Sequence, residues 1–479
     1  MPHVIPLNLS PGNSRGGGIV AADLDGDGAK DFIVTRPGHI AAYTYGGNEL
    51  WHRTADIQVR DEDRQVKGGK AVLGEILPGL HGPGVQVADI DGDRQNEVLF
   101  LDTQSTLQIL QGQTGEIRRQ VRLPVPDGAE QWEHLVVANF RGQGDRDLLV
   151  QATSTEGHPV GRFLAAYAID DLLRGDASTP LWTRDDFFSA AHNGARVADI
   201  DGDGRDEVLA GSLISPEGEK LFEVPIEPDA DLMHPHIDGV YVADVRSDLP
   251  GLEVVILEES SASSNSILGI NHHQVNRVLR LGNRLFFRNK PVLWAAERVI
   301  VYNQDGLLWQ SHFNYLEPQN AIVGDFDPDR DGLEIWCRSR LDEYQTPFVF
   351  DAQGQVISDY ELVNKAPSDW TVKGVEVINP IHWTGESAQL GAAKARHESG
   401  DVAIFEPITG KFLYRFREAA DRLYVADVVG DWREEVIVLN GDQLHVYENP
   451  NDNPNPQHQS LWLENAYQRS KMTWNYYSP

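Results

Sequence analysis

Alternating aspartates between two apolar runs are the feature that most constrains the fold of this chain. The clearest example is VADIDGDGRDEVLAG, residues 197–211. Three carboxylates this close repel each other, so we expect a cation between them. Loops that wrap calcium place oxygen ligands at positions 1, 3, 5 and 9 and a backbone carbonyl at position 7. In this stretch the ligands are Asp199, Asp201, Asp203, the carbonyl of Arg205, and Glu207.

The acidic motif recurs, and internal repetition is stronger evidence for a fold than a single motif. Eight copies begin at residues 23, 89, 139, 199, 244, 325, 376 and 427. Only three copies keep the full set of acids, and we predict calcium at these three alone. The other two complete sets are Asp23, Asp25, Asp27 and Asp31, and Asp89, Asp91, Asp93 and Glu97. The weaker copies are predicted to be structural turns.

The residues around each copy predict β-strands rather than helices. The flanks are short and rich in β-branched residues, so each loop joins two strands. Most copies are followed by a second unit of strand, glycine-containing turn and strand, such as HIAAYTYGGNELWH. Four strands per repeat are the content of a propeller blade. We therefore predict an all-β, eight-bladed β-propeller, or a seven-bladed one if the weakest copy, around Glu376, is miscounted.

The two ends of the chain are predicted to complete this ring. The segment HVIPLNL near the N-terminus can add a strand to the last blade after LHVYENP, and this closure removes exposed sheet edges. Residues 1–448 then form a single propeller domain. Residues 449–479, a segment rich in proline and asparagine with an aromatic end, are expected to dock on the propeller.

Charge and cysteine content restrict the possible partners. The formal net charge of -32 argues against nucleic acid and anionic membranes as partners. The single cysteine, Cys337, excludes an intramolecular disulfide. No apolar run approaches transmembrane length. We expect a monomer, and the compartment stays open: extracellular or periplasmic if a leader was removed, otherwise cytoplasmic.

Residues just upstream of the acidic loops are candidates for a functional site, because equivalent positions in a propeller lie at equal height near the axis. Five to eight residues upstream, four consecutive blades carry His81, His134, His192 and His236. The equivalent windows of the other blades contain Arg15, Arg422, Asn320 and Trp370. Outside these windows, His272 is a candidate for a lid, and Arg338 and Tyr344 for the same rim. For each of these residues, ordinary packing or a polar loop is the structural alternative.

A ring of histidines and arginines suits one kind of chemistry. Two arginines can neutralise a carboxylate through paired, charge-assisted hydrogen bonds. Neutralising the carboxylate of a uronic acid acidifies the proton on the adjacent carbon, and a neutral histidine can then remove it. A second histidine or a tyrosine could protonate the leaving oxygen, which completes a β-elimination. Hydrolysis by paired carboxylates is the competing scheme, and it has only Asp238 and Glu317 as an inward-facing pair.

The repeats resemble those of the calcium-binding β-propeller polysaccharide lyases, especially the eight-bladed rhamnogalacturonan lyases. The likeness is carried by the eight copies, by DIDGDGRDEV, and by the variants DVRSDLPGLEVVILEE and DFDPDRDGLEIWCRSR, over residues 19–440. The loops are also similar to FG-GAP repeats, and ulvan and rhamnose-glucuronate lyases are propellers of similar chemistry. The resemblance implies calcium sites, a catalytic cleft on one face of the ring, and elimination at a uronic acid linked to rhamnose.

Two functions therefore remain open. The first is a calcium-dependent lyase acting on an acidic polysaccharide that contains rhamnose and uronic acid, with arginine neutralising the uronate and histidine or tyrosine as base and acid. The second is a non-catalytic calcium-binding propeller that binds carbohydrate or protein, because integrin-like and lectin-like propellers carry the same loop.

Overall fold

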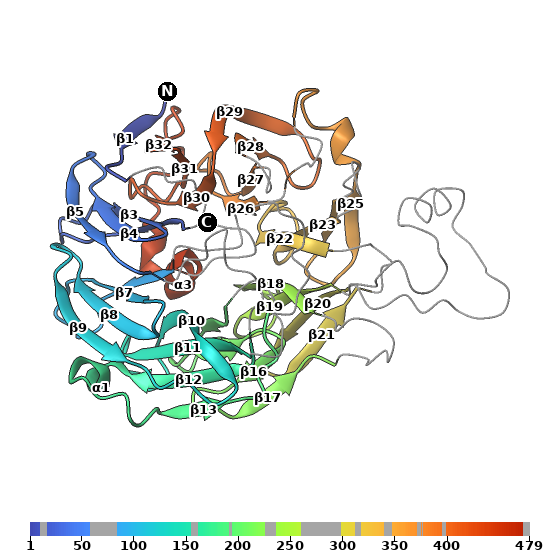
Figure 1. Ribbon diagram of the computed structural model, residues 1–479. Helices are drawn as coiled ribbons and strands as arrows, with labels where there is room; N and C mark the ends of the chain where they lie inside the picture. The colour runs from blue at the N-terminus through green and yellow to red at the C-terminus, as the bar shows by residue number, and fades with distance from the viewer. Residues whose placement is uncertain are drawn as a thin grey trace, which may run out of the picture.

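The chain forms a ring of eight antiparallel sheets around a central axis (Figure 1). This computed structural model describes residues 1–9, 17–57, 84–154, 161–190, 194–225, 236–259, 298–311, 318–339, 347–370, 375, 377–394 and 399–472. Every sheet has four strands. The predicted eight-bladed propeller is confirmed, and the seven-bladed alternative is wrong.

The first four blades follow each other along the chain, and each begins with its innermost strand. Their strands are β2 (Ile19–Ala22), β3 (Asp31–Arg36), β4 (His39–Tyr43) and β5 (Glu49–Thr54); β6 (Val85–Ala88), β7 (Glu97–Leu101), β8 (Thr106–Gln111) and β9 (Ile117–Arg122); β10 (Ala129–Ala138), β11 (Asp147–Ser154), β12 (Phe163–Ala168) and β13 (Trp182–Arg184); and β14 (Arg196–Ala198), β15 (Glu207–Leu209), β16 (Ser212–Ile214) and β17 (Lys220–Glu223).

The last four blades repeat this order. Their strands are β18 (His236–Ala243), β19 (Glu253–Glu259), β20 (Arg298–Asn303) and β21 (Gly306–Gln310); β22 (Pro318–Gly324), β23 (Glu334–Ser339), β24 (Phe348–Phe350) and β25 (Val356–Asp359); β26 (Val377–Ile381), β27 (Leu390–Lys394), β28 (Gly400–Phe405) and β29 (Phe412–Ala420); and β30 (Arg422–Ala426), β31 (Glu435–Asn440), β32 (Gln443–Tyr447) and β1 (His3–Pro6). Short helices α1 (Ile169–Leu173) and η1 (Leu362–Asn364) lie between strands.

The N-terminal strand closes the ring as predicted. Strand β1 pairs antiparallel with β32, from His3 opposite Val446 to Pro6 opposite Gln443. The eighth blade is therefore built from both ends of the chain, so its pairing also joins the first blade to the last. Closure of this kind holds the two ends of the chain together within one sheet.

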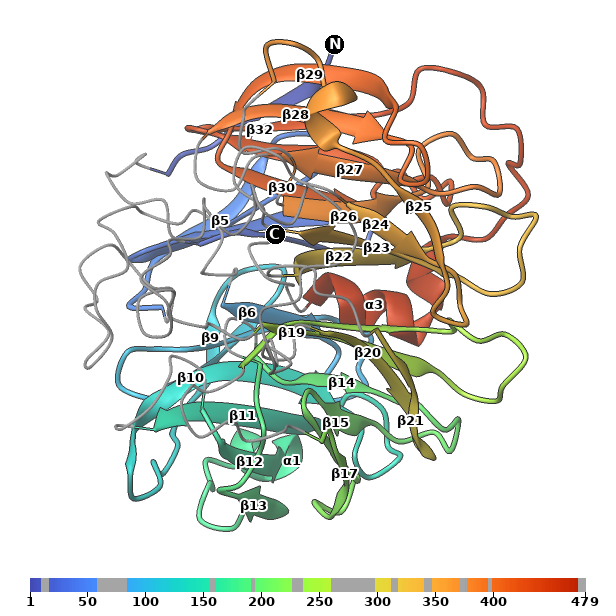
Figure 2. The same ribbon diagram turned by 90° about the vertical axis from the view of Figure 1, so that its right-hand side faces the viewer.

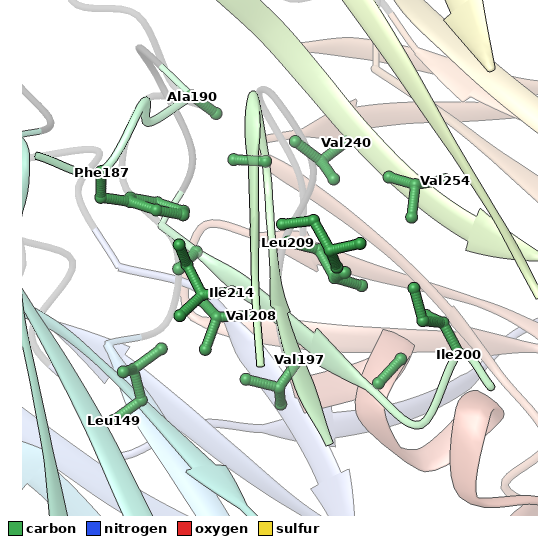
Figure 3. Packing of buried hydrophobic residues seen from close by; sticks show 14 of the residues in the cluster. Leu149, Phe187, Ala190, Val197, Ile200, Val208, Leu209, Ile214, Val240 and Val254 are labelled. Carbon is green, nitrogen blue, oxygen red and sulfur yellow. The ribbon is translucent and has the colours of Figure 1, made fainter. Parts of the chain in front are cut away.

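Apolar residues fill the spaces between neighbouring blades. Strand β3 is buried along its whole length, whereas the outermost strand β9, IRRQVR, exposes all but one of its side chains. Figure 3 shows one interface, in which Leu149 of β11 faces Val208 and Ile214 of the next blade, with Val240 and Val254 beyond them. Inner strands are thus covered on both faces, as their continuous apolar runs require.

In the seventh blade, the acidic-loop position starts at a different residue from the one predicted from the sequence. Its innermost strand, β26, begins at Val377, so the acidic-loop position of this blade begins at His382 and not at residue 376. The loop HWTGESAQ carries a single acid, which is why the motif could not be located there from sequence. The blade itself was counted correctly.

The C-terminal segment crosses the ring after the last blade. A turn of 3-10 helix, η2 (Leu461–Leu463), leads into helix α3 (Asn465–Met472), which lies in the middle of the ring (Figures 1 and 2). Helix α3 packs against the innermost strands β2, β6, β14 and β18. Among the described residues, none of the helices has the length and apolar character needed to cross a membrane.

Two basic side chains of α3 tie opposite sides of the ring together. Arg469 contacts Asp145 of the third blade at 2.7 Å and Asp206 of the fourth at 2.9 Å. Lys471 contacts Glu434 of the eighth blade at 2.8 Å and donates to the carbonyl of Val425 at 2.7 Å. The charges of Asp206 and Glu434 are almost fully buried, with 2% of each side chain exposed. The helix therefore supplies the cations that these carboxylates need.

We predict that Arg469→Met lowers the free energy of unfolding by about 3–5 kcal/mol, because it leaves a buried carboxylate without its cation. The measurement is urea-induced unfolding followed by circular dichroism. Arg174→Met is the matched control, because Arg174 forms an exposed ion pair with Asp171 and its loss should change little. Equal stability of both variants would show that α3 does not stabilise the ring.

Candidate functional site

Each innermost strand begins at one face of the ring, the strand-start face, and ends in an acidic loop at the other, the aspartate-loop face. Several predicted site residues lie outside the described residues: Arg15, His81, His192, His272 and Tyr344. His236 begins strand β18, but its side chain is not among those described. The proposed roles of all six residues stay predictions.

His134 lies on the innermost strand β10 and is half-buried. Its ring packs against the backbone of Gly194 in the next blade, where a Cβ atom would lie only 3.1 Å from its Cγ. It shares a small pocket with Gln86 and Arg196. Gly194 follows His192 by two residues, but His192 itself lies outside the described residues.

Arg422 is buried where the eighth blade meets the first. It begins β30, and its Nε donates to the carbonyl of Gly17 at 2.8 Å while Nη1 donates to the carbonyl of Asp421 at 3.0 Å. Gly17 follows Arg15 by two residues. Arg422 therefore holds Gly17 in place, whereas Arg15 lies outside the described residues.

The other described candidates occupy two different environments. Asn320 and Arg338 are buried opposite each other on β22 and β23, and the hydroxyl of Tyr241 donates to Asn320 Oδ1 at 2.6 Å. Trp370 lies in a hydrophobic cluster with Leu362 between the sixth and seventh blades. Trp370 was selected because it lies five to eight residues upstream of residue 376. The loop of this blade begins at His382 instead, so Trp370 is not at the position equivalent to His134.

Buried cations, most of which the sequence did not single out, gather at the strand-start face. Among the described residues, six Lys or Arg side chains are buried, and all lie where an innermost or third strand starts or a second strand ends: Arg36, Arg196, Arg298, Arg338, Lys394 and Arg422. Arg36, Arg196, Arg298 and Lys394 were missed. For Arg36 the available signal was a basic residue five positions after the last acid of its loop, in DFIVTR.

Burial makes these charges costly. Burial lowers the pKa of the Arg196 guanidinium to about 9 and lowers that of Arg36 as well. Both side chains nevertheless stay cationic at neutral pH. At the same face two acids with buried side chains are described: Glu258, which binds Arg298 at 2.5 Å, and Glu418, which lies 2.7 Å from His445. The described part of this face is therefore suited to an anionic ligand.

The three complete acidic loops share one geometry. Asp23 accepts hydrogen bonds from the N–H groups of Gly26 and Gly28, and Asp199 accepts them from Gly202 and Gly204, at 2.7–3.1 Å. Carboxylate oxygens lie within 4.8 Å of one another in three groups: Asp23, Asp25 and Asp27; Asp89, Asp91 and Glu97; Asp199, Asp201 and Asp203. Asp93 is not part of the second group. Clustered oxygens of this kind are suited to a hard divalent cation.

The second complete loop differs from the other two. Arg118 contacts Asp91 at 2.6 Å and also reaches Glu97, so a guanidinium already balances part of the charge. Arg94 holds a positive φ of 68° where the other loops have Gly28 and Gly204. In the third loop Arg205 contacts one loop carboxylate, Asp203, at 3.1 Å, whereas Arg118 binds two carboxylates of the second loop, which therefore needs an external cation least.

Four of the weaker loops contain their own cation. In each, an arginine of the loop binds a loop carboxylate at 2.6–2.8 Å: Arg141 with Asp147, Arg246 with Asp248, Arg330 with Asp327, and Arg433 with Asp431. An arginine of each of these loops thus balances part of the loop's negative charge. Their geometry agrees with their interpretation as turns.

The last acid of each complete loop is buried. Burial, and then the neighbouring aspartates, raise the pKa of Glu207 to about 8; burial is also the largest cause for Glu97, raised to about 7, and Asp31, raised to about 6. Each nevertheless accepts a backbone hydrogen bond, from Ile200, Ile90 and Leu24 respectively. A bound divalent cation would act in the opposite direction on the pKa of these groups.

Comparison with known proteins gives matches along nearly the whole chain. No family model matches it. Rhamnogalacturonan endolyase YesW of Bacillus subtilis is 22% identical over 504 aligned positions, which cover 93% of this chain and 70% of that protein. Rhamnogalacturonan exolyase YesX of the same organism is 23% identical, covering 89% and 69%.

Solved structures show the same fold. A rhamnogalacturonan lyase PL11 of Bacillus licheniformis superposes with a TM-score of 0.58 at 17% identity, covering 99% of this chain and 81% of that one. The biofilm matrix protein Bap1 of V. cholerae gives a TM-score of 0.52 at 13% identity, covering 96% and 94%. At these identities the likeness establishes a shared propeller fold.

Proposed function

We propose that this protein is a polysaccharide lyase that cleaves an acidic polysaccharide containing rhamnose and uronic acid by β-elimination. The observation that carries the proposal is the gathering of buried cations at the strand-start face, which suits a polyanionic substrate. The two curated relatives named as rhamnogalacturonan lyases, which align with about nine tenths of the chain, support the same reaction.

In the proposed mechanism, Arg15 and Arg422 bind the uronate carboxylate at the junction of the first and last blades. Neutralising this carboxylate lowers the pKa of the C5 proton, which a neutral histidine then removes. The electron pair of the C–H bond forms the C4–C5 double bond, and the bond from C4 to the glycosidic oxygen breaks. A second histidine or Tyr344 gives that oxygen a proton. The candidates for base and acid are His81, His134, His192 and His236.

Other residues of the same face are proposed to position the sugar. Asn320 and Arg338 lie opposite each other beneath this face, and buried side chains of this kind hold a site rigid. His272 is proposed to belong to a lid. Trp370 is the weakest of the proposed substrate contacts, because it packs in the hydrophobic cluster described above.

We also propose that calcium binds the acidic loops, first at Asp23, Asp25, Asp27 and Asp31 and at Asp199, Asp201, Asp203 and Glu207. The loop of Asp89, Asp91, Asp93 and Glu97 should bind it more weakly, because Arg118 already contacts two of its carboxylates. Calcium would neutralise these carboxylates and fix the loops. These loops lie at the face opposite His134 and Arg422, so the proposed role of calcium is structural.

Chelation is predicted to lower the melting temperature, since a ligand that binds only the folded state stabilises it by mass action. In Asp25→Asn, elemental analysis should find about one calcium fewer per chain. The control is Asp248→Asn in a loop whose charge is balanced by Arg246, and its calcium content should equal that of the wild type. A melting temperature indifferent to chelator, with no calcium detected, would contradict the proposal.

The lyase activity is tested by ultraviolet absorbance of unsaturated uronate products across a panel of acidic polysaccharides. We predict product formation, and a loss of about 10²–10⁴-fold in turnover for the variant that removes the general base or acid. His81→Ala, His134→Ala, His192→Ala and His236→Ala are compared with the control His458→Ala. His458 stacks on Trp432 in the C-terminal segment. Full activity of all four variants, each shown to be folded, would rule out this ring as the catalytic site.

The same panel separates the lyase from a non-catalytic binding protein. The likeness to Bap1, a biofilm matrix protein by name, favours this second candidate. Binding of an acidic polysaccharide by calorimetry, without any unsaturated product, would support it over the lyase.

A further inference from the structure

Two histidines of the first blade meet at their ring nitrogens. His39 begins strand β4 and His52 lies in the neighbouring strand β5. Nδ1 of His39 is 3.3 Å from Nε2 of His52. The ring centroids are 5.5 Å apart and the ring planes are inclined by 43°, so the rings are not stacked. The two side chains therefore meet through their nitrogens and not through their faces.

The sheet holds the two histidines in this arrangement. In the register of β4 and β5, Ala41 lies opposite His52, and His39 lies opposite Thr54. His39 and His52 are therefore diagonal neighbours on one face of the sheet, where side chains about 7–8 Å apart at Cβ are still within reach of each other. Strand β4 also pairs with β3, which is buried along its whole length. A site on such strands is held more precisely than a site on a loop.

The pair lies at the outer part of the strand-start face. His39 is opposite Arg36, the last residue of β3 and one of the buried cations of that face. His39 is half-buried and His52 is exposed, so water and ions can reach both rings. In the described part of the chain, neither ring forms a hydrogen bond with any other group. Both histidines are therefore available to a ligand.

The distance between the two nitrogens fits a shared metal ion. Hydrogen bonds from N–H groups in proteins are usually 2.7–3.2 Å long, so 3.3 Å is at the outer limit of that interaction. Zinc binds imidazole nitrogen at about 2.0–2.1 Å with tetrahedral geometry, which places two ligand nitrogens about 3.3–3.4 Å apart. An ion between His39 and His52 would therefore require no change in their separation.

The ligand atoms decide which class of ion binds. Imidazole nitrogen suits zinc, copper and nickel, whereas calcium takes oxygen ligands. The acidic loops offer oxygen ligands at the opposite face, so the two kinds of site can be distinguished by their ligand atoms. Two histidines fill two of the four positions of a tetrahedral ion, which leaves two for water or for an oxygen atom of a bound molecule.

We propose that Nδ1 of His39 and Nε2 of His52 bind one divalent transition-metal ion, for which zinc matches the distance. Water completes its coordination. The proposal rests on the geometry of the first blade and does not depend on the proposed lyase activity. The bound ion would add positive charge to the face that already carries the buried cations.

The test is isothermal titration calorimetry of the full chain with zinc chloride, in buffer with an excess of calcium that competes for the oxygen ligands of the acidic loops. We expect one zinc-binding event that is weakened by about 10²-fold or more in His39→Ala and in His52→Ala, because two linked ligands bind far more tightly than one. The matched control is His458→Ala, which removes another exposed histidine and should bind zinc as the wild type does.

A second measurement identifies the ligand atoms. Electron paramagnetic resonance of the protein with one equivalent of copper(II) should show nitrogen hyperfine coupling, which the double variant His39→Ala, His52→Ala loses. Copper held by the carboxylates of the acidic loops would show no such coupling. If His39→Ala does not fold, His52→Ala decides the outcome, because His52 is exposed. Absence of zinc binding, unchanged zinc binding in the folded single variants, or nitrogen coupling retained in the double variant would overturn the inference.

Discussion

A hydrogen bond from a loop N–H to a buried carboxylate is the interaction on which each blade depends. In seven blades the acid that begins or immediately precedes the second strand accepts it: Asp31, Glu97, Asp147, Glu207, Glu253, Glu334 and Glu435. In the seventh blade, whose loop has no acid at this position, the N–H of His382 donates to Glu434 of the neighbouring blade instead. The bond fixes the register of the two innermost strands, and it also places a buried negative charge at one face that must be balanced.

The ways of balancing that charge account for much of the remaining structure. Loop arginines act in four blades, helix α3 reaches Asp206 and Glu434, and the complete aspartate sets remain for an external cation. The six buried cations lie at the opposite end of the strands, where Glu258 and Glu418 are the acids with buried side chains in the described part of the chain. This arrangement separates charge along the axis of the ring, and it does so within a chain of net charge -32.

A feature could be predicted from the sequence when its signal lies within one short stretch of the chain, and was missed when it depends on residues far apart in the chain. The aspartate loops are local patterns of nine residues, so the eight blades and their closure by β1 could be counted from the chain alone. The loop of the seventh blade was misplaced because its charge comes from Glu434, about fifty residues away. Arg196 and Lys394 were missed for a related reason. Arg196 begins an apolar strand and Lys394 ends one, and only the assembled ring brings these two strand termini to the same face. The proximity of His134 to Gly194, by contrast, follows from the equal height of equivalent residues.

The axial separation of charge bears on how an acidic polymer could approach a protein that is itself strongly acidic. Long-range repulsion from the net charge is screened beyond about 8–10 Å at physiological salt, so the local field near a face decides what binds there. At the strand-start face, the buried guanidinium and ammonium groups are surrounded by low-dielectric side chains, where each acts more strongly than it would in water. By the same screening, cations bound in the aspartate loops would act mainly on the carboxylates of that face, whereas binding of an acidic polymer at the strand-start face would depend on the charges of that face.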